Sequence, residues 1–119
     1  LEAVLRGNPN DPAVLNDLAW ALVTRHDPAR RDPVRAHTLA RRAVELLEGG
    51  FAFGADARLT LAHTRDTLAE ALFQLGRFDE AAALQRSAVD VARTEGVTGD
   101  DLLDLTQRLE KIEAAKKKN

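Results

Sequence analysis

Few side chains in this sequence have the type and spacing that catalysis or metal binding needs. The three histidines, His26, His37 and His63, form no H-x3-H or H-E-x-x-H pattern, so no pair is spaced to ligate a metal ion. The only serine, Ser87, lies outside a G-x-S-x-G sequence, and the glycines around Gly49 do not form a phosphate-binding loop. The chain has no cysteine, which excludes thiolate chemistry. We therefore expect no catalytic residues, no metal and no cofactor: the chain is not predicted to be an enzyme.

An acidic run near the C-terminus has two interpretations. Asp100, Asp101 and Asp104 could form a cation site. Acidic side chains in the first turn of a helix also interact favourably with its dipole, and this is their common role. We favour the second interpretation.

Basic residues gather in three short runs: Arg30-Arg31, Arg41-Arg42 and Lys116 to Lys118. No aromatic residues are interleaved with them, and the net charge is -2, so the sequence does not predict a nucleic-acid partner. Arg41 with Glu45 and Arg86 with Asp90 are spaced for ion pairs along a helix.

The composition favours helices. Alanine (21) and leucine (18) far outnumber valine and isoleucine (9 together) among the 119 residues, and there is no tyrosine. No apolar run approaches the roughly 20 residues that span a membrane, so no membrane partner is predicted. The length suits one domain. We expect a soluble all-α domain.

Local signals divide the chain into five helices. Asp-Pro pairs at 11–12 and 32–33 are typical helix starts, and Asp56 is the predicted N-cap of the third helix, after a connector at 51–54. Gly49-Gly50 and Gly76 are predicted helix ends. The expected helices cover residues 12–25, 33–48, 57–75, 79–95 and 98–118. The last of them carries one apolar stripe, formed by Leu102, Leu105, Leu109 and Ile112.

The sequence repeats itself. The pattern L-x2-L-A-x2-L at 15–22 recurs as R-x2-L-A-x2-L at 65–72, and A-x3-A-x2-A at 36–43 recurs as A-x3-Q-x2-A at 81–88. The two offsets, 50 residues from Ala19 to Ala69 and 45 from Ala36 to Ala81, differ by an insertion around 26–32. The chain is therefore predicted to contain two copies of a helix pair.

At these residues the sequence resembles the tetratricopeptide repeat family, whose first helix has the signature W-x2-L-G-x2-Y. Leu68, Ala69 and Leu72 stand at the packing positions of that helix, and residues 76–81 are similar to the family's turn. Arg65 stands where the family has an aromatic residue.

The resemblance implies an all-α fold, an α-α superhelix of two helix hairpins and a C-terminal capping helix in a single domain over residues 1–119. Its parts would be the end of a preceding repeat (1–10), a first repeat with a lengthened inter-helix loop (11–50), a second repeat (56–96) and the cap (98–119). Because the sequence begins at Leu1 rather than methionine, we expect it to be part of a longer protein. Because residues 1–12 resemble the end of a preceding repeat with its closing proline, we expect the array to extend upstream.

In this family the first helix of each pair lines a concave groove. Helical spacing then predicts these groove residues: Asn16, Trp20, Val23, Thr24, His63, Asp66, Glu70, Phe73 and Gln74. Two interpretations of Trp20 and Phe73 remain open. They could fill space between neighbouring repeats, or they could form an apolar floor on which a peptide docks.

The charged residues on the predicted groove face limit the chemistry of the expected partner. Family members that capture a C-terminal carboxylate use lysine, arginine and asparagine on this face, whereas Asp66 and Glu70 stand there in this chain. We expect no carboxylate clamp, but a segment with apolar anchors and some positive charge. The predicted function is a non-catalytic protein-protein interaction or scaffold module that binds a peptide segment or another protomer. The alternative is a structural spacer or C-terminal cap of a repeat array attached to a catalytic domain.

Overall fold

The computed structural model describes Gly7, residues 10–50 and residues 55–118, and in these residues it contains helices and no strand. The elements are α2 (Pro12–Thr24), the short 3-10 helix η1 (Pro28–Arg30), α3 (Pro33–Glu48), α4 (Ala55–Gln74), α5 (Phe78–Thr94) and α6 (Gly99–Lys118). The predicted all-α fold is confirmed, and the predicted bounds differ from these by no more than about two residues, the usual uncertainty of a helix end.

Aspartates begin the first two long helices as predicted. The Asp11 carboxylate accepts a hydrogen bond from the backbone N–H of Ala13 at 3.0 Å, and that of Asp32 accepts one from Arg35 at 3.1 Å. Each is followed by a proline at the first helical position. The prediction for Asp56 is wrong, because α4 already begins at Ala55 and Asp56 lies in its first turn, where its charge still complements the helix dipole.

Two further predictions fall where the structure gives no description. The connector at 51–54 lies outside the described residues, as does the predicted end of a preceding repeat at 1–10, apart from Gly7 and Asn10.

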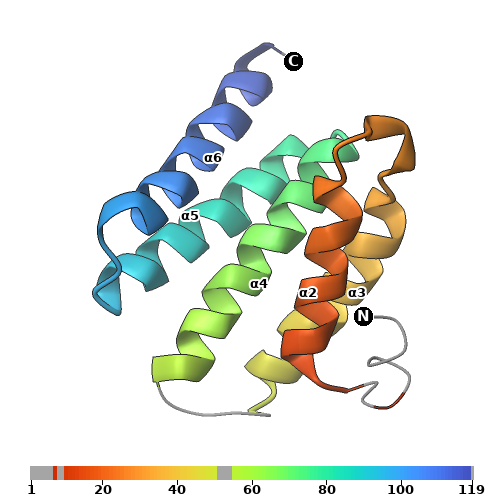
Figure 1. Cartoon of the computed structure of the whole chain (residues 1–119). Helices are drawn as coiled ribbons and strands as arrows, with labels where there is room; N and C mark the ends of the chain where they lie inside the picture. Colours follow the sequence, from red (N-terminus) through yellow and green to blue (C-terminus); the bar gives the residue numbers. More distant parts are fainter. Residues whose placement is uncertain (1–6, 8–9, 51–54, 119) are drawn as a thin grey trace.

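The helices follow one another as antiparallel neighbours (Figure 1). Two hairpins, α2 with α3 and α4 with α5, are joined by packing of α4 against both α2 and α3, and α6 lies along α5. Helix α4 is therefore central.

The insertion between α2 and α3 is held by its own side chains. Arg25 Nη1 donates to the Arg30 carbonyl at 2.9 Å, and Arg31 Nε donates to the Arg25 carbonyl at 2.8 Å. The backbone N–H of Asp32 also returns to the carbonyl of Leu22 at 2.9 Å. Part of the basic run at 30–31 thus stabilises this loop.

The core is built at the positions that repeat in the sequence. Three pairs of equivalent alanines are fully buried: Ala19 and Ala69, Ala36 and Ala81, Ala43 and Ala88. The leucines between them, such as Leu22 and Leu72, are buried too. Small side chains allow the helix backbones to approach closely while leucines fill the grooves between them.

The central position of α4 explains why its buried surface runs around the whole helix. Every residue from Asp66 to Leu72 is buried, which is two complete turns. These turns include Asp66, Thr67 and Glu70, so this helix carries polar groups into the interior. Such groups need partners inside the fold.

Helix α6 packs through the predicted stripe. Leu105 and Ile112 are buried, and the half-buried Leu102 and Leu109 pack beside Val89 and Ala92 of α5. Fully buried Gln85 of α5 stands where the first copy has Ala40, and its Nε2 donates to the carbonyl of Leu105 at 3.0 Å.

The molecule does not extend as a rod. Its radius of gyration is 13.8 Å, close to the roughly 13.5 Å expected for a compact domain of this length. No helix in the described part of the chain is long and apolar enough to span a membrane.

Candidate functional site

A pocket of about 300 Å³ opens between α2, α4 and α6. It is lined by Asn16, Asp17, Trp20, His63, Asp66, Thr67, Asp101, Asp104, Leu105 and Arg108. Three segments that are far apart in the sequence meet here. Helix α4 lies between α2 on one side and α5 with α6 on the other, so side chains from α2 and α6 meet over α4 (Figure 1).

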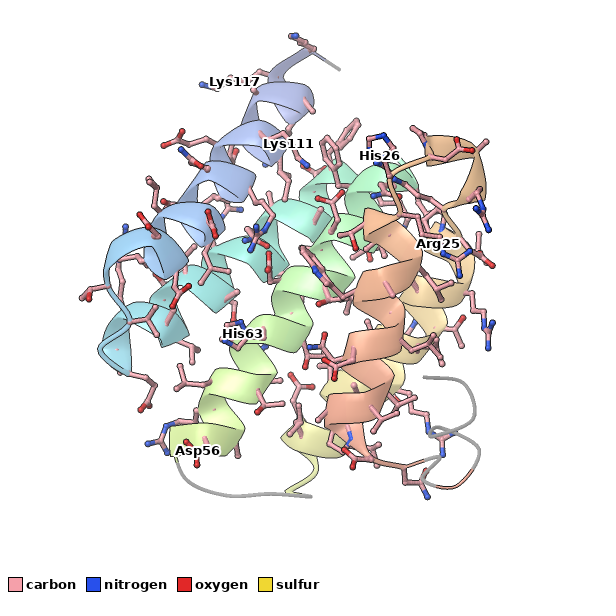
Figure 2. All side chains as sticks on the ribbon, viewed as in Figure 1. Arg25, His26, Asp56, His63, Lys111 and Lys117 are labelled. Carbon is pink, nitrogen blue, oxygen red and sulfur yellow. The ribbon has the colours of Figure 1, made fainter. Side chains whose placement is uncertain are left out.

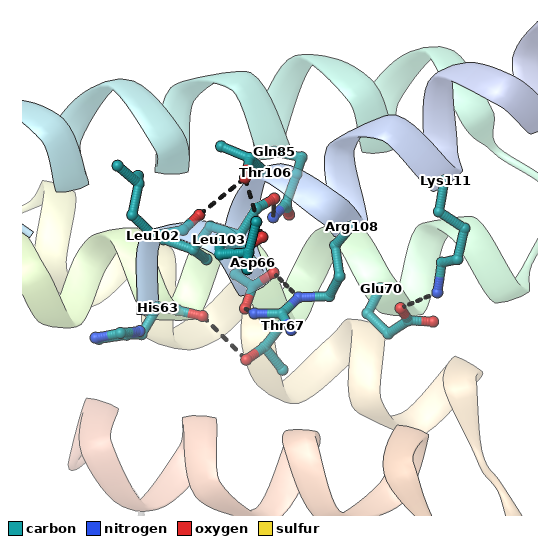
Figure 3. Close-up of polar contacts among 11 residues, drawn as sticks. His63, Asp66, Thr67, Glu70, Gln85, Leu102, Leu103, Thr106, Arg108 and Lys111 are labelled. Atoms are coloured by element: carbon teal, nitrogen blue, oxygen red, sulfur yellow. Dashed lines mark hydrogen bonds and ion pairs between the residues drawn. The ribbon is translucent and has the colours of Figure 1, made fainter. Parts of the chain in front are cut away.

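One arginine of α6 connects the three helices at this pocket. Arg108 donates from Nε to Asp66 Oδ1 at 2.8 Å and from Nη2 to Asp66 Oδ2 at 2.6 Å, a bidentate pair between α6 and α4 (Figure 3). Its guanidinium carbon also lies 5.3 Å from the centre of the Trp20 ring of α2, within the range of a cation–π contact.

The environment of this arginine favours its charge. Burial alone lowers the pKa of Arg108, but the hydrogen bonds and the negative charge of Asp66 outweigh it and leave that pKa above its ordinary value. The Asp66 carboxylate is almost completely covered. Asp66 therefore belongs to an internal ion pair at the wall of the pocket.

A second ion pair lies further along α4. Lys111 Nζ contacts Glu70 Oε1 at 2.9 Å (Figure 3). The same Nζ lies 4.5 Å from the centre of the Phe73 ring. Gln74 Nε2 donates both to Glu70 Oε2 at 3.0 Å and to the carbonyl of Val23 at 2.8 Å. This network connects α6, α4 and the end of α2.

The predicted groove residues thus divide into three sets. Asn16, Trp20, His63 and Asp66 line one pocket, as a shared binding face requires. Glu70, Phe73 and Gln74 belong to the neighbouring network. The last two, Val23 and Thr24, lie at the end of α2.

The prediction that Val23 lines the groove is wrong. This side chain is buried in the core, because α2 packs against both α3 and α4 and its buried arc is wider than one stripe. Thr24 is exposed, and its hydroxyl donates to the Trp20 carbonyl at 2.7 Å.

The two aromatic residues differ in position. Trp20 is half-buried: it packs against the core and also lines the pocket, a position that is compatible with both interpretations. Phe73 packs against the core and against Phe78, with ring centres 5.5 Å apart, and it does not line the pocket.

Sequence reasoning missed Arg108 and Lys111. Asp66 and Glu70 are spaced i,i+4 on α4, and the two cations are spaced i,i+3 on α6, so each pair shares one face of its helix. The similar spacing of two acidic residues on one helix and two basic residues on another was the available signal for these ion pairs. This spacing does not show how the two helices are aligned or which residues pair, because the partners are more than 40 residues apart in the sequence.

Three aspartates at the pocket are exposed: Asp17 on α2, with Asp101 and Asp104 on α6. Asp101 lies in the first turn of α6, as the dipole interpretation predicts. Among the described residues, Asp17 and Asp101 form no ion pair, and Asp104 acts only at a distance on Arg108. Asn16 Oδ1 is buried and has no hydrogen-bond donor in the described chain.

The other candidate residues for chemistry do not assemble. Arg25 and His26 lie together near the end of α2, far from His63 on α4 (Figure 2). No group of metal-binding side chains occurs in the described part of the chain. Ser87 Oγ accepts a hydrogen bond from Arg65 Nη1 at 2.8 Å, and Arg65 also pairs with Glu48 at 3.1 Å. Arg65 thus connects α4 with α3 and α5.

Of the two ion pairs predicted within helices, one is confirmed and the other is wrong. Arg41 lies 3.4 Å from Glu45. Arg86 pairs with Glu113 of α6 instead of Asp90, because α6 lies along α5 and brings that carboxylate within reach.

No family model, curated protein or solved structure matches this chain. The geometry of the pocket is therefore the basis for a functional proposal.

Proposed function

We propose that the chain is a non-catalytic protein-interaction module built of tetratricopeptide-like helix hairpins, and that it binds a peptide segment at the face of α2, α4 and α6. The observation that carries this proposal is the pocket of about 300 Å³ with the only tryptophan of the chain, half-exposed, at its wall. Tryptophan and arginine are the side chains that most often dominate binding energy at protein interfaces.

The walls of this pocket are held in place before any partner arrives. Arg108 is fixed by two hydrogen bonds to Asp66, and Trp20 packs against the core. A preorganised surface loses little conformational entropy on binding, which favours affinity from a small contact area.

A second candidate function is a C-terminal cap or spacer of a repeat array. It is supported by α6, whose Leu105 and Ile112 are buried while Gln107, Glu110 and Lys117 point to solvent. Terminal units of repeat proteins need such a polar outer face. A cap and a binding face are compatible, because α6 also forms one wall of the pocket.

A display experiment with an unbiased set of peptides tests the binding function. A random peptide library is selected on the whole chain, and the affinity of enriched peptides is measured through the fluorescence of Trp20. We expect Trp20→Ala to weaken binding by about 30-fold, the effect of losing roughly 2 kcal/mol at a hot spot, measured with labelled peptide. Binding to another copy is followed in parallel by light scattering.

Two variants control this experiment. Asn16→Ala removes a pocket group that has no partner inside the fold, so it should weaken binding while leaving stability unchanged. Leu103→Ala removes an exposed apolar side chain of α6 outside the pocket and should leave binding unchanged. Peptides that bind all variants equally would contradict the proposed site.

A further inference from the structure

Resting on the proposed function, we infer that the segment bound in this pocket carries a basic side chain, arginine or lysine, whose charge lies among Asp17, Asp101 and Asp104. These carboxylates stand on opposite walls, one on α2 and two on α6. The acidic residues predicted from the sequence for this role, Asp66 and Glu70, are occupied by Arg108 and Lys111.

The charge of the pocket favours a cation. Its lining includes four aspartates and one arginine, an excess of three carboxylates over guanidinium groups. The N-terminal dipole of α6 offsets about half an elementary charge. The remaining field attracts basic segments and repels both peptide carboxylates and nucleic-acid phosphates.

The free aspartates are placed to act together. Asp101 and Asp104 are three residues apart, so their side chains lie on one face of α6, and Asp17 lines the same pocket from α2. A cation between them would be paired from both walls.

The chain already contains one example of this recognition. The Arg108 guanidinium lies over the indole of Trp20 and is held by the Asp66 carboxylate. An aromatic face next to a carboxylate is thus a stable environment for a cation at this wall.

The size of the pocket fits a side chain rather than a folded partner. A volume of about 300 Å³ is at the lower end of the about 300–1,000 Å³ of ligand pockets and accepts one or two side chains.

The experiment uses the peptides enriched from the random library. We expect arginine or lysine to be enriched in them and their affinity to fall about tenfold for Asp101→Asn/Asp104→Asn at about 50 mM salt. Replacing the basic residue of a peptide by glutamine should remove the difference between wild type and this variant. The difference should also shrink at about 500 mM salt, because these charges are exposed.

The matched control is Asp56→Asn/Asp90→Asn. It makes the same change in net charge, includes one aspartate in the first turn of a helix, and touches no residue of the pocket. A fall in affinity for this control as large as for Asp101→Asn/Asp104→Asn would overturn the inference.

The remaining outcomes separate this inference from the proposed function. If neutral or acidic peptides are enriched and require Trp20 for binding, the inference of a basic side chain is wrong, and the proposed binding function is retained. If no enriched peptide requires Trp20, the binding function itself is wrong, and the inference is wrong with it.

Discussion

Arg108 joins three helices through a single guanidinium, and its partner Asp66 is only 7% exposed. We expect Arg108→Ala to lower the free energy of unfolding by about 2 kcal/mol, because a buried carboxylate then loses its charged hydrogen bonds. Urea unfolding followed by circular dichroism measures this without relying on Trp20, whose surroundings change in the variant.

A matched comparison comes from the second pair of α6. Lys111 is 48% exposed and Glu70 keeps its hydrogen bond from Gln74, so Lys111→Ala should cost less than about 1 kcal/mol. In the double variant Asp66→Asn/Arg108→Ala, the loss should be smaller than the sum of the two single losses, because neither partner is left charged. Equal costs for Arg108→Ala and Lys111→Ala would contradict this account.

His37 makes the stability of the fold depend on pH. Burial, together with the positive charges of Arg77 and Arg41, lowers its pKa below the ordinary value of 6.5. The unfolded chain therefore binds the proton more readily, so stability is fully present above pH 6.5 and is lost as pH falls through the lower pKa of the folded state. Between pH 7.5 and 5.5, His37→Gln should lose less stability than wild type, as measured by urea unfolding. The exposed His26, changed to glutamine, is the control, and an equal pH dependence in both variants would refute the role of His37.

At the scale of helices, the sequence predicts most of the architecture because the signals are local. Asp-Pro pairs and glycines act within one turn, as Asp11 and Gly76 illustrate, and the repeated alanines identify the contact positions. The residues that line the pocket were predicted only in part. Val23 is buried because two helices pack against α2, and the pairing of Asp66 depends on where α6 lies, which nothing within a few residues specifies.

Helix α6 provides a prediction at this scale, because one of its faces is buried and the other is not. Ile112 is buried in the main core together with Leu72, so Ile112→Ala should lower the free energy of unfolding by about 3 kcal/mol. Leu103, on the same helix, is 49% exposed, and Leu103→Ala should change it by less than about 0.5 kcal/mol. Both are read from urea unfolding curves. Similar values for the two variants would mean that α6 is not held by its apolar stripe.

At the scale of the whole molecule, the packing follows the order of the chain, with two exceptions that both involve α4. Each helix contacts its neighbours in sequence, and α4 additionally contacts α2. Side chains of α6 reach α4 as well, through Arg108 and Lys111. Detachment of any one of the other helices therefore exposes only part of α4. Full exposure of α4 requires all the other helices to separate from it.

This arrangement predicts the order of amide hydrogen exchange. The amides of Asp66 to Leu72 are covered on every side and should exchange only when the whole chain unfolds, so their opening free energy should equal the value from urea unfolding. The amides of η1 and of Lys116 to Lys118 lie at the surface and should exchange through local opening, faster by several orders of magnitude. Exchange followed by NMR under native conditions tests both statements. If amides of α2 or α6 outlast those of α4, the central helix is not the last element to open, and stability is distributed along the chain as in a longer repeat array.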